Sequence, residues 1–270
     1  MKENIGFIGA GNMCQAIIEG WLSKSLVTAA EIGVSNRTPG KLRKLVDELK
    51  VVPRATNEEL VDASDVVVIA VKPQDFETAI EPIASSFTAD QIVISLAAGV
   101  SLRKIKKLLP QCQHLVRVMA NTPARIGRGV FGYCTPLNNL RVDRWMERMF
   151  KPLGYTVKLD EGEQFEAFLV SSSSGVGFVF ELMIYWQEWL EERGIEPEIA
   201  QAITVNTFAG AAELALESQP LSVSELQSKV VSKKGTTAAG LESMRELELE
   251  RLLRYSFEKS ALRDRELGQD

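Results

Sequence analysis

The sequence lacks several features that mark particular classes of protein. It has one histidine, His114, among 270 residues, which excludes histidine-rich zinc sites and disfavours a histidine-based catalytic triad. Its longest uninterrupted apolar run covers residues 66–71, whereas a membrane-spanning helix needs ~20 apolar residues. Lys and Arg number 31 against 36 Asp and Glu, a net charge of −5. We therefore expect no nucleic-acid partner and no attachment to an anionic membrane.

Cysteine is also scarce. Cys14, Cys112 and Cys134 are odd in number and have no metal-ligand spacing, and the simplest interpretation is three reduced thiols. Residues 1–6 contain no apolar core of a signal peptide. These features predict a cytoplasmic protein without a metal site.

Residues 1–160 alternate between short apolar runs and helix-like segments. The runs are rich in Val and Ile without strict alternation, which is typical of strands buried on both faces of a parallel sheet. Strands and helices in alternation predict an α/β fold with a doubly wound Rossmann sheet. Thr56 and Glu59 have the spacing of a capping box, and Pro39 and Pro73 suit the first turns of helices. The strand-like runs cover residues 4–8, 32–35, 65–71, 91–96, 114–119 and 155–159.

Residues 161–270 predict an all-helical domain. Apolar residues recur at helical spacing on more than one face between residues 178 and 190, and residues 199–216 are Ala-rich and apolar nearly all round. Helices of this kind are buried on several sides. We infer that this domain packs against a second copy of the chain, as a homodimer or a ring of dimers. The alternative is that the first domain covers both helices. With no low-complexity linker, the boundary at 160/161 is expected in a continuous helix.

The first predicted strand runs into a glycine turn that opens a helix. Gly9 permits a tight turn, and Gly11 lets the backbone approach a pyrophosphate, whose charge would meet the N–H groups of the following helix. Cys14 stands at the third position, where Gly or Ala is usual, and is small enough for close packing. The turn, which includes Asn12 and Met13, predicts dinucleotide binding. The alternative is a strand–helix turn without a ligand.

The end of the second predicted strand indicates which dinucleotide binds. An NAD site carries Asp or Glu there for the ribose 2′-hydroxyl, but residues 35–38 read Ser-Asn-Arg-Thr. Ser35, Asn36, Arg37 and Thr38 offer donors to a 2′-phosphate, and Arg37 adds charge. The predicted cofactor is therefore NADP, with NADPH preferred over NADH. A solvated surface position for Arg37 is the alternative.

Two later strand ends reach the same edge of the sheet, where open α/β sheets bind ligands. Lys72 follows one of them and can contact phosphate or ribose. The small residues 97–99, Ala-Ala-Gly, follow the other and would let a nicotinamide ring lie against the backbone. The cofactor residues predicted from these turns are Gly9, Gly11, Asn12, Met13, Ser35, Asn36, Arg37, Val71, Lys72, Pro73, Ala97, Ala98 and Gly99.

Five motifs stand in order along the chain. They are Gly-Ala-Gly-Asn-Met at 9–13, Val-Lys-Pro-Gln at 71–74, Arg-Val-Met-Ala-Asn-Thr-Pro at 117–123, Ser-Ser-Ser-Gly at 172–175 and Gly-Thr-Thr at 235–237. Together they resemble the pyrroline-5-carboxylate reductase family over essentially the whole chain. The resemblance implies a Rossmann domain followed by a helical dimerisation domain. It also implies NADPH-dependent reduction of the cyclic imine 1-pyrroline-5-carboxylate to L-proline.

The resemblance also implies roles for individual residues. Ser232 and the backbone of Gly235 and Thr236 would bind the substrate carboxylate, and Thr237 would aim its hydroxyl at the ring nitrogen as the catalytic group. Ser174 and Gly175 would belong to the same site, at a second helix start expected over residues 172–175. Asn121 and Thr122 would line the nicotinamide pocket, and Arg117 would order their loop through a partner that the sequence does not reveal. Simple N-capping is the alternative role for Thr236 and Thr237.

The chain departs from the family pattern around the predicted substrate site. The departures are Ala120 for a proline, Ser173, Val176 and Gly177 for glycine, proline and alanine, and Lys233 and Lys234 for a small pair such as Pro-Gly. Either a shifted substrate or neutral drift would produce them. A reductase of a related imine or keto acid, or a catalytically weak NADP-binding regulatory protein, therefore stays open as an alternative.

Two further classes fit less well. A β-hydroxyacid dehydrogenase shares the layout but needs a lysine on its central helix, and residues 176–193 and 198–217 contain none. A non-enzymatic NADP sensor would not require the element at 235–237.

Overall fold

The computed structural model describes residues 3–136 and 139–269 and divides the chain into two compact units. The first unit comprises the chain up to Ser174 together with the chain from Lys259 onward, and the second is Gly175–Glu258. The division lies later than the expected boundary at 160/161, because α7 (Glu163–Phe168) and the π-helix η6 (Leu169–Ser174) pack on the strand Gly129–Cys134 (β7) of the first unit. It falls inside one continuous helical stretch, Glu163–Glu191.

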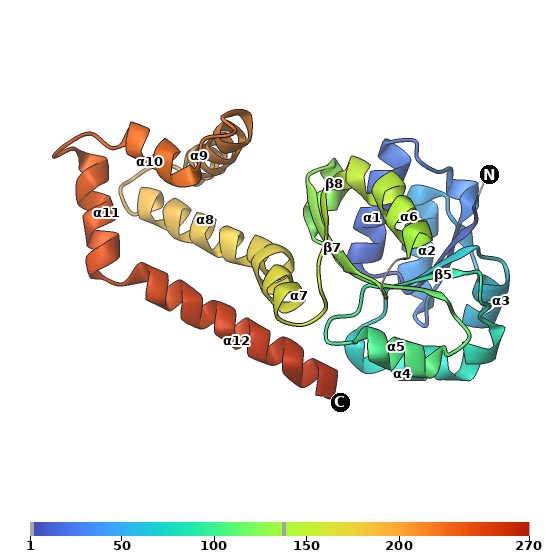
Figure 1. The fold of residues 1–270 in the computed structure, drawn as a ribbon. Helices are drawn as coiled ribbons and strands as arrows, with labels where there is room; N and C mark the ends of the chain where they lie inside the picture. The colour runs from blue at the N-terminus through green and yellow to red at the C-terminus, as the bar shows by residue number, and fades with distance from the viewer. Residues whose placement is uncertain (1–2, 137–138, 270) are drawn as a thin grey trace. The chain divides into compact units, whose positions relative to one another are not determined.

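One eight-stranded sheet organises the first unit (Figure 1). Its order is β3-β2-β1-β4-β5-β6-β7-β8, and all neighbouring pairs are parallel except β6 with β7. The inner order 3-2-1-4-5-6 is that of doubly wound dinucleotide-binding folds, which confirms the predicted fold class. The strands are Ile5–Ile8 (β1), Ile32–Ser35 (β2), Val52–Pro53 (β3), Val66–Ile69 (β4), Ile92–Ser95 (β5), His114–Met119 (β6), Gly129–Cys134 (β7) and Gly154–Lys158 (β8).

Two of these strands have no counterpart among the predicted runs. β3 is two residues long and ends in a proline, too short for a pattern. β7 contains Gly129 and Gly132, which weaken strand propensity. Gly132 is required by packing, because a Cβ there would come within 2.6 Å of the Phe168 ring. Gly132, which obscures β7 in the sequence, therefore lets the strand lie against α7.

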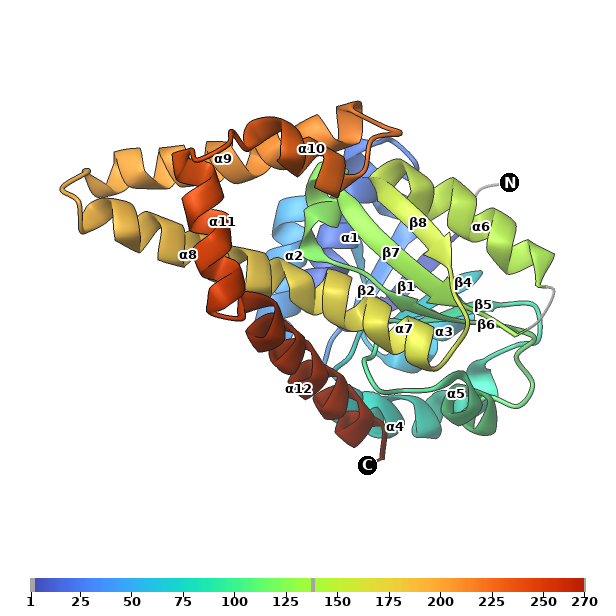
Figure 2. The same ribbon diagram turned by 60° about the vertical axis from the view of Figure 1, so that its left-hand side comes forward.

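Helices cover both faces of the sheet (Figures 1 and 2). Phe7 and Val68 share one core with α1, α2 and α6, whereas Ile8 and Val67 share the other with α3, α4 and α5. Successive strand residues point to opposite faces, so the unbroken Val and Ile runs supply both cores. The α-helices are Asn12–Ser23 (α1), Pro39–Leu49 (α2), Asn57–Asp62 (α3), Phe76–Ile80 (α4), Leu102–Leu108 (α5) and Leu140–Phe150 (α6), and the 3₁₀ helices are Ala29–Glu31 (η1), Pro73–Asp75 (η2), Glu81–Ser86 (η3), Thr122–Ile126 (η4) and Lys151–Leu153 (η5).

Local signals place several of these helix starts. Thr56 caps α3 by accepting a hydrogen bond from the Glu59 backbone N–H at 3.0 Å. The Glu59 carboxylate reaches back to the N–H of Ala55 at 3.0 Å, one residue before the position that the capping box predicts. Pro39 and Pro73 open α2 and η2 as expected.

The second unit contains only helices in its described residues, as predicted. α8 and α9 lie side by side as an antiparallel pair (Figure 2), with Trp186 and Phe208 5.3 Å apart. The sequence has a helical pattern from Ala238 to about Arg265, but Glu248 adopts a left-handed conformation with φ +52° and separates α11 from α12. The helices are Gly175–Glu191 (α8), Pro197–Glu217 (α9), Val223–Val230 (α10), Thr236–Glu246 (α11) and Leu249–Gln269 (α12), the last of which continues into the first unit.

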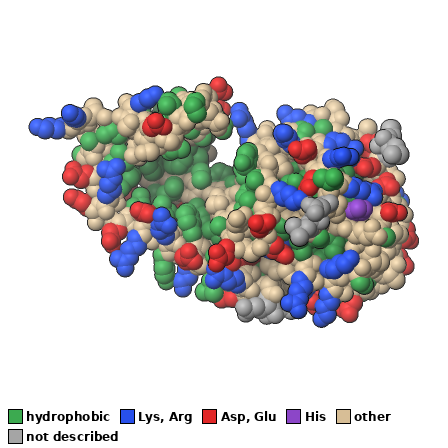
Figure 3. Space-filling view, in the orientation of Figure 1, with side chains coloured by type: hydrophobic (Ala, Val, Ile, Leu, Met, Phe, Trp, Pro, Cys, Tyr) green, Lys and Arg blue, Asp and Glu red, His purple; other side chains and the backbone are tan. Residues whose placement is uncertain are grey.

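The helices of the second unit expose many large apolar side chains. α8 has no buried residue and α9 buries only Ala200 and Thr204, while Phe180 is 58% exposed and Trp189 56%. Figure 3 shows hydrophobic side chains gathered over these helices. By length and composition alone, the stretches Glu163–Glu191 and Pro197–Glu217 could cross a membrane. An apolar surface of this size marks a site of contact with another molecule.

We expect the first unit to depend on an aromatic cluster beneath the sheet. Trp21 is fully buried against Phe7, Trp145 and Phe150, and its Nε1 donates to the Met149 carbonyl at 2.8 Å. Trp21→Ala should lower the free energy of unfolding by about 3–5 kcal/mol, because it leaves a large cavity. Urea unfolding followed by circular dichroism measures the change. Leu140→Ala, at a position 63% exposed, should alter stability by less than about 0.5 kcal/mol, and equal effects of the two variants would contradict this assignment.

Candidate functional site

The turn between β1 and α1 has the backbone that its glycines predict. Gly9 has φ +111°, and a Cβ there would come within 2.7 Å of the Ala70 carbonyl oxygen on the neighbouring β4 loop. Gly11 is the N-cap of α1, and a Cβ there would meet nothing within 4 Å. The open space at Gly11 lies where the free N–H groups of a helix N-terminus attract an anion.

The second strand holds this turn in place. The Gly9 N–H donates to the Ser35 carbonyl at 2.8 Å, and the Ala10 N–H donates to Asn36 Oδ1 at 3.1 Å. The Ser35 hydroxyl donates to Asn57 Oδ1 at 2.7 Å, and Asn36 Nδ2 donates to the Thr38 carbonyl at 2.9 Å. The side chains of Ser35 and Asn36 therefore shape the site. Their own donor groups, which were predicted to bind a phosphate, already donate to other protein atoms.

A cavity of about 650 Å³ opens at the carboxyl ends of β1, β2 and β4. A second cavity of about 490 Å³ adjoins it along the start of α1 and includes Asn12, Met13 and Lys44. Three basic side chains, Arg37, Lys41 and Lys72, line the first cavity. This is the switch point of the sheet, where β1 pairs with both β2 and β4 and doubly wound folds bind dinucleotides. The predicted residues Gly9, Gly11, Ser35, Asn36, Arg37, Val71 and Lys72 all line the first cavity.

The charge around Arg37 has two features that the sequence analysis missed. Lys41, in the first turn of α2, lines the cavity beside Arg37, and its position four residues later in the chain was the available signal. Asp75 lies opposite, with its Oδ1 3.1 Å from Arg37 Nη1. The Arg37 side chain is 81% exposed, so the pair is weak and the guanidinium can turn to a phosphate. The open space at Gly11 and these cations fit a dinucleotide that carries an additional phosphate.

The remaining predicted cofactor residues lie outside these two cavities. Pro73 opens η2 directly after Lys72. Ala97, Ala98 and Gly99 form the loop after β5, where the Ala97 N–H donates to Ser95 Oγ at 3.3 Å and Gly99 has φ +70°. This loop leaves the same sheet edge as the β1 and β4 turns.

The loop after β6 is fixed by Asn121. Its Oδ1 accepts from the Val130 N–H at 2.9 Å and its Nδ2 donates to the Ser172 carbonyl at 3.2 Å. Thr122 begins η4 and is exposed. Both polar atoms of the buried Asn121 side chain therefore form hydrogen bonds within the protein. These bonds fix the loop that contains Thr122.

Ser173 adds a second attachment to the same loop. Its hydroxyl donates to the carbonyl of Ala120 at 3.0 Å. Both residues are departures noted in the sequence, and they touch each other. The hydrogen bond supplies a restraint at a position where a proline would restrict the chain by itself.

The helix start predicted at residues 172–175 is wrong. The chain there continues from the π-helix η6 directly into α8, so Ser174 and Gly175 do not form a helix N-terminus with free N–H groups. Val176 has the backbone N–H that a proline lacks, and nothing forces the helix to end. A π-helical segment inside an α-helix is often found at functional sites.

The loop between α10 and α11 carries the other predicted substrate residues. Gly235 is the N-cap of α11, its N–H donates to the Ser232 carbonyl at 3.1 Å, and a Cβ there would come within 2.2 Å of Ser232 Oγ. Thr236 and Thr237 are the first two residues of α11, and no side chain caps the helix. Their alternative role as N-caps is therefore not observed. Lys234 precedes Gly235 with φ +58°, a left-handed conformation that a non-glycine residue adopts at a cost.

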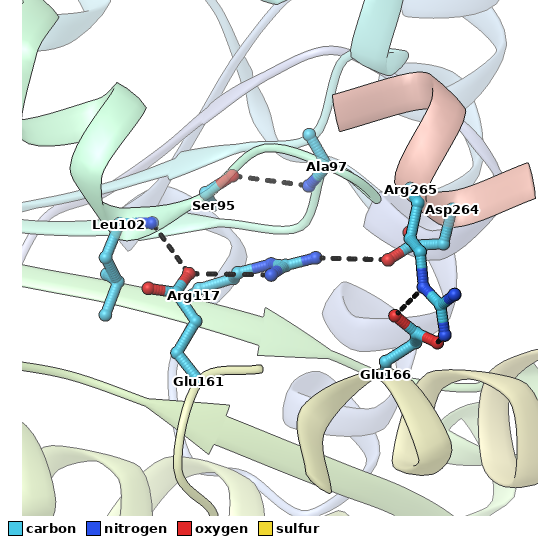
Figure 4. Close-up of polar contacts among 8 residues, drawn as sticks. All are labelled: Ser95, Ala97, Leu102, Arg117, Glu161, Glu166, Asp264 and Arg265. Atoms are coloured by element: carbon cyan, nitrogen blue, oxygen red, sulfur yellow. Dashed lines mark hydrogen bonds and ion pairs between the residues drawn. The ribbon is translucent and has the colours of Figure 1, made fainter. Parts of the chain in front are cut away.

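Arg117 has partners other than the 121–123 loop. Its guanidinium lies 4.6 Å from the centre of the Phe165 ring and near the carboxylates of Glu161 and Asp264 (Figure 4). Asp264 is on α12, far along the chain, and no local pattern in the sequence indicates it.

Two family models match different parts of the chain. Residues 4–99 match the family model described as NADP oxidoreductase, coenzyme F420-dependent, and residues 162–267 match that of pyrroline-5-carboxylate reductase dimerisation. A pyrroline-5-carboxylate reductase of Haemophilus influenzae is 33% identical over 238 residues, which are 88% of this chain and 87% of that protein. The chain belongs to the pyrroline-5-carboxylate reductase family. The first match contains both cavities, and the second contains the exposed apolar helices.

Solved structures of the family have the same fold. The pyrroline-5-carboxylate reductase of Coxiella burnetii is 31% identical, with a TM-score of 0.87 over 99% of both chains. The pyrroline carboxylate reductase of Plasmodium falciparum, solved with NADP bound, is 22% identical, with a TM-score of 0.88 over 99% of both chains. The departures at Ala120, Ser173, Val176, Gly177, Lys233 and Lys234 therefore leave the family fold intact.

We expect the Ser173 hydroxyl to restrain the loop after β6. Ser173→Ala should lower the free energy of unfolding by about 1 kcal/mol, because it leaves the Ala120 carbonyl without this donor, and should speed amide hydrogen exchange at residues 121–124. The matched control is Ser171→Ala, whose exposed hydroxyl bonds only to the Phe168 carbonyl of the same helical stretch. Unchanged exchange in Ser173→Ala, or the same change in both variants, would show that the bond does not restrain the loop.

Proposed function

We propose that this protein reduces 1-pyrroline-5-carboxylate to L-proline with NADPH as the hydride donor. Membership of the pyrroline-5-carboxylate reductase family over nearly the whole chain is the observation that carries the proposal. The cavity at the switch point supports it, because the glycine turn and three cations suit a phosphorylated dinucleotide. Three buried free thiols, with the pKa of Cys112 raised to about 11 by burial, suit a reducing cytoplasm.

The chain's own residues would act mainly by binding and orientation. In the first unit, Gly11, Asn12 and Met13 would hold the pyrophosphate, and Arg37 and Lys41 the 2′-phosphate. Ala97, Ala98, Gly99 and Thr122 would border the nicotinamide, which supplies the hydride when the cofactor is bound. A 2′-phosphate near Arg37 would compete with Asp75 for the guanidinium. The preference for NADPH would therefore depend on whether the Arg37 side chain moves from Asp75 to the phosphate.

In the second unit, the start of α11 would bind the substrate. The Ser232 hydroxyl and the N–H groups of Gly235 and Thr236 would hold the carboxylate, which a helix N-terminus favours. Lys233 and Lys234 add positive charge beside it. Thr237 would direct its hydroxyl at the ring nitrogen. A protonated imine is already electrophilic at carbon, so correct placement can supply most of the acceleration and no histidine is needed.

The helical domain would assemble two copies of the chain into a homodimer. The match to the dimerisation model covers the helices that expose Phe180 and Trp189. A second copy would remove this apolar surface from water, which is the main driving force for stable association.

The first experiment follows oxidation of NADPH by the purified protein with pyrroline-5-carboxylate, with NADH alongside. We expect turnover with both and a higher kcat/KM for NADPH. Arg37→Gln should reduce kcat/KM for NADPH by about tenfold or more with little effect on NADH, because it removes a charge-assisted contact to the 2′-phosphate. Arg43→Gln removes the same charge from α2 outside both cavities and should leave both values unchanged.

Other outcomes would change the proposal in defined ways. Turnover that favours NADH would keep the reaction and overturn the role of Arg37. NADPH binding without turnover of this imine would point to a related imine or keto acid, or to a regulatory role.

The dimer proposal predicts that one charge on the apolar face of α8 disrupts assembly. Phe180→Asp should shift the protein towards monomer in sedimentation velocity at micromolar concentration, since a buried unpaired carboxylate opposes association. Leu140→Asp makes the same kind of change at an exposed position of the first unit and should leave the sedimentation coefficient unchanged. A wild-type protein that sediments as a monomer would contradict the proposal.

A further inference from the structure

A buried arginine joins three distant parts of the first unit. The Arg117 side chain, on β6, is only 8% exposed. Its Nη1 lies 3.5 Å from Glu161 Oε1 and its Nη2 lies 3.7 Å from Asp264 Oδ2 (Figure 4). The guanidinium also lies over the Phe165 ring. The side chain of Asp264 is only 10% exposed. One buried cation therefore lies between two carboxylates, which satisfies the requirement that buried charges be paired.

Both carboxylates also lie beside the backbone that follows β5. Glu161 Oε1 accepts from the Leu102 N–H at 2.8 Å. The Gly99 N–H lies near the Asp264 carboxylate and favours its charged form, whereas burial raises the pKa of that carboxyl. The two carboxylates therefore flank residues 99–102, at the end of the Ala97–Gly99 loop. Arg117 fixes the position of both carboxylates, so it controls this loop indirectly.

The last turn of α12 packs closely against the same loop. A Cβ on Gly99, which has φ +70°, would come within 2.7 Å of the Gly268 nitrogen and 2.8 Å of the Leu267 carbonyl carbon. Arg265 pairs with Glu166 of α7 through Nε at 2.8 Å and Nη2 at 2.5 Å. The end of α12 is thus attached at two points, one buried at Asp264 and one exposed at Arg265.

The Arg117–Asp264 pair depends on the attraction between two opposite charges that are both buried. Among the described residues, Arg117 Nε and Nη2 and Asp264 Oδ1 are buried without a hydrogen-bond partner. Loss of the Asp264 charge would leave Arg117 with Glu161 as its one counter-ion among the described residues, so the guanidinium would shift towards Glu161 and away from α12. The Gly99 N–H would at the same time lose the negative charge beside it.

We propose that Asp264 is a positioning residue for the Ala97–Gly99 loop, so that the end of α12 sets the affinity for the nicotinamide half of the cofactor. The inference rests on the proposed function, because it needs the dinucleotide to extend from the Arg37 cavity along the sheet edge to this loop. The adenosine half would bind at Arg37 and Lys41 and would be independent of Asp264. A change at Asp264 that acts on the loop should therefore weaken binding of the nicotinamide half alone, whereas a general loss of structure should weaken binding of both halves.

The test compares binding of NADPH and of adenosine 2′,5′-bisphosphate to the full-length protein by isothermal titration calorimetry. In Asp264→Asn we expect Kd for NADPH to rise by about tenfold, a usual size for coupling between contacts, and Kd for the bisphosphate to stay within about twofold of wild type. KM for NADPH should rise in parallel, with kcat at saturating NADPH much less affected. Glu266→Gln is the control, since Glu266 lies on the same helix in an exposed pair with Arg263 and should change neither Kd. Asp264→Glu keeps the charge and should recover part of the affinity.

A second variant covers the case in which Asp264→Asn does not fold. Arg265→Gln removes the exposed attachment of the same helix end, at a side chain 55% exposed, and should weaken NADPH binding in the same direction by a smaller factor. Equal weakening of both ligands, or no weakening of NADPH by either folded variant, would overturn the role of Asp264 alone. A wild-type protein that binds neither ligand would overturn the proposed function and this inference with it.

Discussion

The first unit depends on the close approach of the turn after β1 to the loop after β4, at the switch point of the sheet. Gly9 turns there with φ +111° and passes within contact distance of the Ala70 carbonyl, where a side chain has no room. Because β1 pairs on both sides with parallel strands, its exit turn must leave over the neighbouring strand ends. The same constraint opens the cavity, aims the N-terminus of α1 into it and brings Arg37 and Lys72 from separate loops to one edge.

Local sequence patterns were sufficient for the central strands and the glycine turn. Val and Ile runs identify β1, β4 and β5 because those strands are buried on both faces. The patterns failed where tertiary contacts override local preference. Residues 172–175 suggest a helix start, but the serines lie in a π-helix that continues into α8. Glu248 breaks a helix without a glycine, and β7 carries glycines that its packing demands. Asp75 was missed because only folding brings it beside Arg37, whereas Lys41 lies four residues after Arg37 and was available in the sequence.

The substrate-side departures have different physical weights. Ser173 has a definite contact with Ala120, so these two residues form one compensating change in the loop after β6. Val176 removes a reason for the helix to stop, and the helix continues. Lys234 occupies a left-handed position next to the N-terminus of α11, a conformation whose cost is usually tolerated where the residue has a function. The two lysines therefore place positive charge next to the helix N-terminus that is proposed to bind the substrate carboxylate.

The order of the helices along the chain brings the end of α12 back to the first unit after the apolar helices. The chain leaves the first unit at Ser174 and returns at Lys259, so the second unit is inserted between two attachments to the Rossmann sheet. The return lets Asp264 and the Gly268 backbone support that loop from a distant part of the chain. Since the intervening helices carry the dimerisation match, one continuous segment links the assembly surface to the loop expected to border the nicotinamide.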